Sequence, residues 1–246
     1  MTLKNIILCL IFFAAFNSIA APLTVGAGVA VSSSPYKYKD KTTYDPLPLL
    51  SYYGDDFYID GPEFGLNLFK NEQQQLTLIA SYDLHHFDPK YAIDSLKKVS
   101  KRNATLFSGV GYTLYTSVGD FTTTVLQDTL GKSKGMKINA EWSTMTDFNQ
   151  WSLGYVAGVE WNSKKQNRYY YGIDKNESLK SGVVMYEPKS SLTPYTGFTV
   201  AYAFNPEWVA ILFANAYFTP EEQKKSPLSS GKSVAYTSGI AVSYSF

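Results

Sequence analysis

The stretch Val234 to Phe246 constrains the fold of this chain more than any other. Bulky apolar and aromatic side chains occupy alternate positions there, with small or polar ones between them. This period of two predicts a β-strand with one apolar face. The strand ends on Phe246, two residues after Tyr244. An aromatic-ended strand of this kind is typical of the closing strand of a bacterial outer-membrane β-barrel, whose bulky face contacts lipid while the small face lines the interior.

The first 20 residues predict a cleaved secretory signal peptide. Lys4 gives a positive start, and the apolar run 6–16 is shorter than the roughly 20 residues of a membrane-spanning helix. Small residues at Ser18 and Ala20 favour cleavage before Ala21. The single cysteine, Cys9, lies in this segment. We therefore expect the mature chain to have no disulfide, thiol nucleophile or cysteine metal site.

The composition fits an exported barrel and disfavours other classes. Removing Lys4 leaves 21 of the 22 Lys and Arg residues against 21 Asp and Glu residues. Such a neutral chain lacks the basic footprint of a nucleic-acid-binding protein. The 20 Tyr, 15 Phe and 4 Trp residues suit the membrane–water interface. A soluble β-sandwich can also be rich in tyrosine, so these counts support a barrel without requiring one.

The strand patterns predict an all-β fold in which residues 21–246 form a single domain. We expect a transmembrane antiparallel up-and-down barrel of about twelve strands, with about ten as the main alternative, and both chain ends on the periplasmic side. This count takes 57–69 as one strand bent at Gly61-Pro62, and joins 166–173 with 182–187 as one interrupted strand. Trp151 and Trp161 lie at the two ends of one face, a spacing that matches one membrane crossing.

Several short blocks, in order and spacing, resemble the MltA-interacting protein / OmpV family of outer-membrane proteins. The blocks are Asp45 to Pro48, Tyr52-Tyr53, Phe57 to Gly61, Tyr170 to Ile173, Glu177-Ser178, Tyr186 to Pro188, Ser226 to Leu228 and Tyr244 to Phe246. The resemblance implies an outer-membrane barrel without established chemistry. For the family's named member it implies a scaffold that joins a lytic murein transglycosylase and a penicillin-binding protein. The resemblance does not identify any residue of this chain as a contact for these partners.

The two histidines, His85 and His86, are the main candidates for chemistry. On a strand, Asp83 and His85 point inward together, and a carboxylate can orient an imidazole as a base. The alternative is a solvated pair at a strand end. Because no motif singles out a nucleophile, we expect a protein that is not an enzyme and that uses no cofactor or metal.

Five polar residues are expected to face the lumen: Asp83, His85, Lys137, Glu141 and Glu160. They predict either a polar pore lining for a small solute or charges paired for stability, and the second interpretation is favoured because barrel interiors are polar in general. A small-solute channel is accordingly the alternative to the scaffold function. A surface lipid hydrolase using His85 is a weaker third possibility.

The segment from Phe87 to Arg102 is expected to bind a protein partner. In the predicted strand order it lies on the periplasmic side, where long connections are unusual. Its candidate contact residues are Asp88, Tyr91, Asp94, Lys97, Lys98, Lys101 and Arg102. A murein transglycosylase or penicillin-binding protein is the partner that the resemblance implies.

Two aromatic segments have simpler interpretations. The run Tyr169 to Tyr171 fits an aromatic girdle better than a carbohydrate platform. The loop from Ser34 to Tyr44 carries Lys and Tyr residues and is expected to face lipopolysaccharide outside the membrane.

Overall fold

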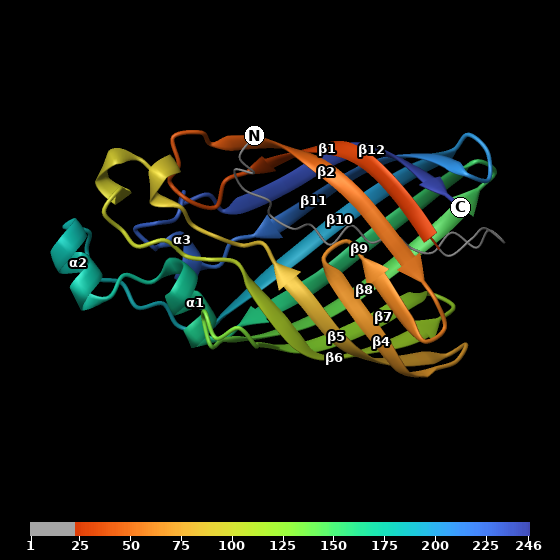
Figure 1. Cartoon of the computed structure of the whole chain (residues 1–246), viewed down its shortest axis with the longest axis horizontal. Helices are drawn as coiled ribbons and strands as arrows, with labels where there is room; N and C mark the ends of the chain where they lie inside the picture. The colour runs from red at the N-terminus through yellow and green to blue at the C-terminus, as the bar shows by residue number, and fades with distance from the viewer. Residues whose placement is uncertain (1–22) are drawn as a thin grey trace.

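The computed structural model describes residues 23–246, so the predicted signal peptide lies outside the described residues. Twelve antiparallel strands close into a barrel in which sequence neighbours pair and the last strand pairs with the first (Figure 1). The strands are β1 (Leu23–Ser33), β2 (Thr42–Tyr53), β3 (Phe57–Asp60), β4 (Glu63–Lys70), β5 (Gln74–Asp83), β6 (Thr105–Thr116), β7 (Gly119–Asp128), β8 (Met136–Phe148), β9 (Trp151–Asn162), β10 (Ser191–Ala203), β11 (Trp208–Phe218) and β12 (Val234–Ser245).

The closing strand behaves as its sequence predicts. Val29 of β1 pairs with Ile240 of β12, and these two bulky side chains are 42% and 58% exposed on the outer surface. The alternate residues Ala241 and Ser243 are buried inside. Closure by β1 and β12 leaves no open sheet edge, as hydrocarbon surroundings require.

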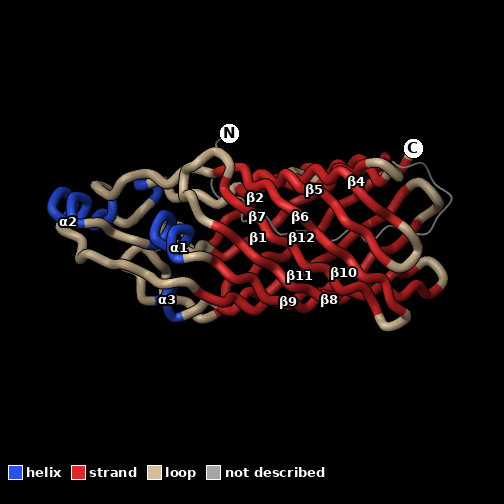
Figure 2. The backbone as a smooth tube through the Cα atoms, turned by 90° about the horizontal axis from the view of Figure 1, so that it is seen from below, coloured by secondary structure: helices blue, strands red, loops and turns tan. Residues whose placement is uncertain are grey.

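The segments that connect the strands are short at one end of the barrel and long at the other. One end carries Leu23, Phe246 and the short turns 54–56, 71–73, 117–118, 149–150 and 204–207, and we call it the turn end. The other end, here the loop end, carries the long connections 34–41, 84–104, 163–190 and 219–233. Figure 2 shows all helices gathered beyond the strands at this loop end.

The predicted strand 57–69 is in fact two strands. Gly61 has a positive φ of 54°, and Asp60 pairs with Glu63, so Gly61 and Pro62 form a two-residue hairpin between β3 and β4. Glycine at the first central position is the pattern of a type II′ turn. The prediction of a bend within one strand is therefore wrong.

The predicted interrupted strand in 166–187 is also wrong, because this region is helical. It forms α1 (Lys164–Tyr171) and α2 (Lys175–Ser181), and a third short helix, α3 (Glu221–Lys224), follows β11. Within residues 23–246, no helix is long and apolar enough to cross a membrane. One strand gained at 57–70 and one lost at 166–187 leave the expected number of twelve unchanged.

Ten buried side chains of the long connections pack into a loop-end cluster. They are Tyr36, Tyr38, Phe87, Ala92, Leu96, Val99, Tyr170, Tyr171, Ile173 and Leu228. Since each connection supplies members, burying them together ties the four connections into one cap. Tyr170 and Tyr171 are 1% and 6% exposed. The prediction that they belong to a lipid-facing girdle is wrong.

The position predicted for Phe87 to Arg102 is also wrong. The extra hairpin at Gly61-Pro62 reverses the direction of every strand from β4 to β9 relative to the predicted order. As a result this segment follows β5 at the loop end, opposite the end that carries Leu23 and Phe246. It contains two short 3-10 turns, Pro89–Tyr91 and Asp94–Leu96.

Apolar side chains fill part of the barrel interior nearer the turn end. Leu49 of β2 packs with Ala201 of β10, Val209 and Ile211 of β11, and Ala241 of β12. We call these five residues the lumen cluster. The strands β10, β11, β12, β1 and β2 are consecutive in the closed sheet, so the lumen cluster is an apolar patch along one arc of the inner wall.

Candidate functional site

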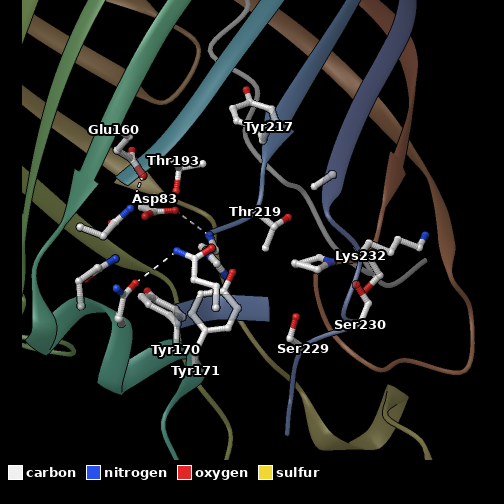
Figure 3. Close-up of a pocket in the computed structure, with 18 of the residues that line it drawn as sticks. Asp83, Glu160, Tyr170, Tyr171, Thr193, Tyr217, Thr219, Ser229, Ser230 and Lys232 are labelled. Atoms are coloured by element: carbon white, nitrogen blue, oxygen red, sulfur yellow. Dashed lines mark hydrogen bonds between the residues drawn. The ribbon is translucent and has the colours of Figure 1, made fainter. Parts of the chain in front are cut away.

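A cavity of about 180 Å³ lies at the loop end, between the strand ends and the cap, and we call it the loop-end cavity (Figure 3). Its lining comes from the ends of β5, β8, β9, β10, β11 and β12, from α1, and from the connections 34–41, 84–104 and 219–233. Four of the five predicted lumen residues line it: Asp83, His85, Lys137 and Glu160.

Lys137 is the electrostatic centre of the cavity. Its Nζ lies 2.5 Å from Asp83 Oδ2 and 3.9 Å from Glu160 Oε2. The register of β8 with β9 explains the contact between Lys137 and Glu160. Lys137 pairs with Asn162, and Glu160 lies two positions earlier on β9, so its side chain points to the same inner face. Asn162 Nδ2 donates to Glu160 Oε1 at 2.7 Å. The two carboxylates therefore share one ammonium group, which lies 4.9 Å from the centre of the Phe107 ring.

His85 follows β5 and bonds to the cap. Its Nε2 lies 2.6 Å from the hydroxyl of the buried Tyr36, and its ring stacks on Tyr170 at 4.4 Å between centroids. Burial lowers the pKa of His85 to about 4, with the charge of Lys137 acting in the same direction and Asp83 opposing it. The imidazole is therefore neutral at pH 7, and its Nε2 shares a hydrogen bond with the Tyr36 hydroxyl.

The dyad expected for a hydrolase does not form. Asp83 Oδ1 accepts a hydrogen bond from the backbone N–H of His85, at 2.8 Å, and not from its ring. The Asp83 carboxylate instead pairs with Lys137. Within residues 23–246 no carboxylate bonds to the His85 ring, so the Asp–His pairing of a catalytic triad does not form there. Among residues 23–246, no group of three or more His, Asp or Glu side chains is arranged to hold a metal ion.

Helix α1 supplies cavity residues that the sequence analysis missed. Gln166 and Asn167 are 3% and 1% exposed and line the cavity beside Tyr170 and Tyr171. Asn167 Nδ2 donates to the Lys189 carbonyl and to Ser191 Oγ, which fixes the helix against β10. A signal for this helix exists in the sequence: Ser163 caps it by accepting from the N–H of Gln166, and Ser followed three residues later by Gln is a capping-box pattern.

Glu141, the fifth predicted lumen residue, lies deeper in the barrel and apart from the cavity lining. Its Oε2 accepts from the Tyr195 hydroxyl at 2.6 Å. That ring reaches β8 by crossing Gly158 of β9, where an added Cβ would lie 2.4 Å from the Tyr195 ring. Only glycine leaves room for this close approach. Glu141 Oε1 has no hydrogen-bond partner among residues 23–246.

The predicted partner-binding residues lie in the cap, and several are engaged within it. Asp88 caps the first 3-10 turn and lies near Lys90 and Lys101, at 3.5 and 3.6 Å. Asp94 pairs with Lys97 at 2.7 Å. Tyr91 packs against the loop-end cluster. The exposed members of this set are Asp94, Lys97, Lys98 and Lys101.

Arg102, the last member of that set, is a structural link inside the cap. Its side chain is 9% exposed and bonds to Glu177 Oε2 of α2 at 2.7 Å and to the Gly172 carbonyl at 3.1 Å. The second oxygen of Glu177 accepts from the N–H of Ser100. With these groups satisfied, Arg102 is not available to a partner protein.

Comparisons with known proteins agree with the barrel and its place in the cell. The MltA-interacting protein of Escherichia coli (strain K12) is 32% identical over 206 residues, which cover 83% of each chain. The outer membrane protein OmpV of Vibrio cholerae is 24% identical over 188 residues, which cover 74% of this chain and 70% of OmpV.

Among solved structures, the NanC porin has a similar fold. It superposes with a TM-score of 0.50 at 11% identity and covers 91% of this chain and 100% of its own. The family model for MltA-interacting protein MipA matches residues 25–246, almost all of the described barrel. The chain is an outer-membrane β-barrel and belongs to the MltA-interacting protein (MipA) family.

Proposed function

We propose that this chain is a non-catalytic outer-membrane barrel that anchors a peptidoglycan-processing enzyme through its turn end. The observation that carries the proposal is the name of a relative that is 32% identical over 83% of the chain, a protein that interacts with MltA. In bacterial outer-membrane barrels the short turns face the periplasm and the longer loops face outward. An enzyme that works on peptidoglycan would therefore meet the turn end of this barrel and not its cap.

The charge of the turn end suits a basic partner. Among the side chains of residues 23–246, five exposed carboxylates lie on its turns and strand ends, against one exposed cation, Lys70; the five are Asp55, Asp56, Glu72, Asp147 and Glu207. Most of the Lys and Arg residues lie at the loop end. Complementary charge speeds association and selects partners. We expect the partner enzyme to present a basic surface to this rim.

Exposed apolar side chains between these carboxylates supply contact area for docking. Val118, Phe148 and Phe204 are 66%, 68% and 59% exposed at the turn end. Aromatic anchors inside a polar rim are the usual composition of a binding surface. The rim of the barrel carries both features.

Co-purification from envelope membranes tests this function. The tagged wild type is expected to recover a lytic murein transglycosylase, and Asp55→Lys with Asp56→Lys is expected to reduce that recovery at least fivefold. Glu187→Lys, an exposed charge reversal at the loop end, is the matched control and is expected to recover as much enzyme as the wild type. Equal recovery by all three proteins would remove the turn end as the partner surface.

A small-solute channel is the second candidate, and the polar loop-end cavity is the observation that favours it. The lumen cluster disfavours a wide water-filled path, since apolar side chains line one arc of the interior nearer the turn end. The lysines of the cap favour contact with the anionic groups of lipopolysaccharide, which supports anchoring in the outer leaflet.

A further inference from the structure

The loop-end cavity has no part in a periplasmic scaffold, because it lies at the opposite end of the barrel from the turns. Its volume of about 180 Å³ is far below the roughly 300–1,000 Å³ of sites for drug-sized ligands. It equals about six water molecules at roughly 30 Å³ each. A compact molecule with a single ring is the size that fits.

The charges around the cavity cancel. Among residues 23–246 the charged side chains that line it are Asp83, Glu160, Lys137 and Lys232, two of each sign. His85 adds no charge at neutral pH. Lys137 is already shared between the two carboxylates. The lining therefore favours a neutral ligand over an anion or a cation.

Two polar atoms beside the cavity lack hydrogen-bond partners among the described residues. They are Oε1 of Gln166, a side chain that is 97% buried, and Oγ1 of Thr193. A buried polar group without a partner destabilises the state that contains it. The terminal torsion of glutamine is broad, so a small rotation can turn Oε1 towards an incoming donor. A ligand with hydroxyl or N–H groups could supply the missing hydrogen bonds to these two atoms.

Aromatic rings complete the lining. Tyr170 and Tyr171 lie on one side of the cavity and Tyr217 lies on the other (Figure 3). The planar amides of Asn162 and Gln223 lie near them in the same lining. Rings offer an apolar face to C–H groups, while amides and carboxylates pair with hydroxyls that both donate and accept. This combination suits a molecule with an apolar face and a hydroxylated rim.

We propose that the loop-end cavity binds a neutral polyhydroxylated ring of monosaccharide size. The ring lies between Tyr171 and Tyr217, and its hydroxyls donate to Gln166, Thr193 and the carboxylates while they accept from the amides. A free sugar and the terminal sugar of a longer glycan present the same ring. The site is specific for neutral rings because an added charge would meet a lining that is already balanced.

Calorimetric titration of the purified full-length barrel in detergent tests the proposal. The probes are glucose, galactose and N-acetylglucosamine as neutral rings, a maltooligosaccharide for a terminal ring, and glucosamine and glucuronate as charged analogues. We expect saturable binding of at least one neutral probe, free or terminal, and at least tenfold weaker binding of its charged analogue. No saturable binding up to about 100 mM, at the weak limit of detectable affinity, would overturn the proposal, and so would tighter binding of a charged probe.

Matched variants locate the binding. Gln166→Met keeps the shape of the side chain and removes its hydrogen bonds, and it is expected to weaken binding at least tenfold. Gln73→Met makes the same exchange on an exposed turn at the opposite end and is expected to bind as the wild type does. Thr193→Val provides an independent second variant in case Gln166→Met disturbs α1. Unchanged affinity in both cavity variants would place any bound sugar elsewhere and contradict the assignment.

Discussion

Arg102 and Glu177 form an ion pair whose side chains are 9% and 6% exposed, although the two residues lie 75 positions apart in the chain. The pair joins the connection after β5 to helix α2. Three further bonds surround the pair: Arg102 donates to the Gly172 and Ser100 carbonyls, and the Ser100 N–H donates to Glu177. The cap is therefore held by a polar link as well as by the loop-end cluster.

Arg102→Met is expected to loosen the cap without unfolding the barrel. Removing one partner of a buried pair leaves the other charge unpaired, which costs about 3–5 kcal/mol. Trypsin should then cut after Lys175 and Lys180 at least tenfold faster than in the wild type. Arg168→Met is the control, because Arg168 and Glu187 form an exposed pair worth about 0–1 kcal/mol. Equal cleavage rates in the two variants would show that the buried pair does not hold α2.

Stability is expected to fall as the pH decreases from about 6.5 to about 4. The pKa of His85 is lowered by burial to about 4, so in that window the unfolded chain binds a proton that the folded chain does not. Its contribution to stability is complete above the unfolded value and is lost on acidification. Because the ring lines a cavity and is only half-buried, we expect a loss of about 1–2 kcal/mol.

Urea unfolding in lipid vesicles at a series of pH values measures this effect. His85→Gln should show a shallower acid dependence than the wild type, and the difference between the two isolates His85 from titrating carboxylates. His86→Gln is the matched control, since the ring of His86 bonds to the nearby Leu84 carbonyl. Identical pH profiles for His85→Gln and the wild type would contradict the prediction.

Lys137→Met is expected to destabilise the loop end by leaving Asp83 and Glu160 without their shared cation. Cavity water reduces the cost below that of a fully buried pair, and we expect about 2–3 kcal/mol. Adding Asp83→Asn should restore part of the loss, because it removes one of the two uncompensated charges. Lys132→Met, on an exposed loop, should be neutral. The free energy of unfolding is measured with urea in lipid vesicles. If the losses caused by Lys137→Met and Asp83→Asn simply add, the two side chains are not coupled and the prediction is contradicted.

Much of the barrel follows from alternation along single strands. The bulky residues at even positions from Val234 to Phe246 lie outside, and the inward positions Lys137 and Glu160 meet across two paired strands. Both results depend only on the period of two and on pairing between neighbours. The boundaries of a hairpin are harder to predict from the sequence. Gly61-Pro62 fits a bulge as well as a turn, and the register of Asp60 with Glu63 decides between them.

The cap could not be predicted, because its contacts join connections that are distant in sequence. Tyr36 meets His85 and Tyr171 only once the three connections that carry these residues have packed together. The helices do carry a local signal, since Ser163 with Gln166 and Asp174 with Glu177 are both N-cap pairs. The alternation predicts that Asp83 and His85 lie on the same face. The His85 ring, however, bonds to Tyr36, and no pattern in the sequence predicts that contact.

The wild-type barrel is expected to show negligible steady conductance in planar lipid bilayers. The cap covers the loop end, and the lumen cluster, which includes Leu49 and Ile211, lines the interior near the turn end with apolar side chains. A narrow apolar constriction resists wetting, so ions have no hydrated path. Leu49→Ser with Ile211→Ser should admit water and raise the conductance. The lipid-facing neighbours Leu50→Ser with Leu212→Ser should not, since those side chains are 44% and 46% exposed on the outer surface. A steady wild-type current comparable to that of an open porin would refute the occluded lumen and favour the channel function.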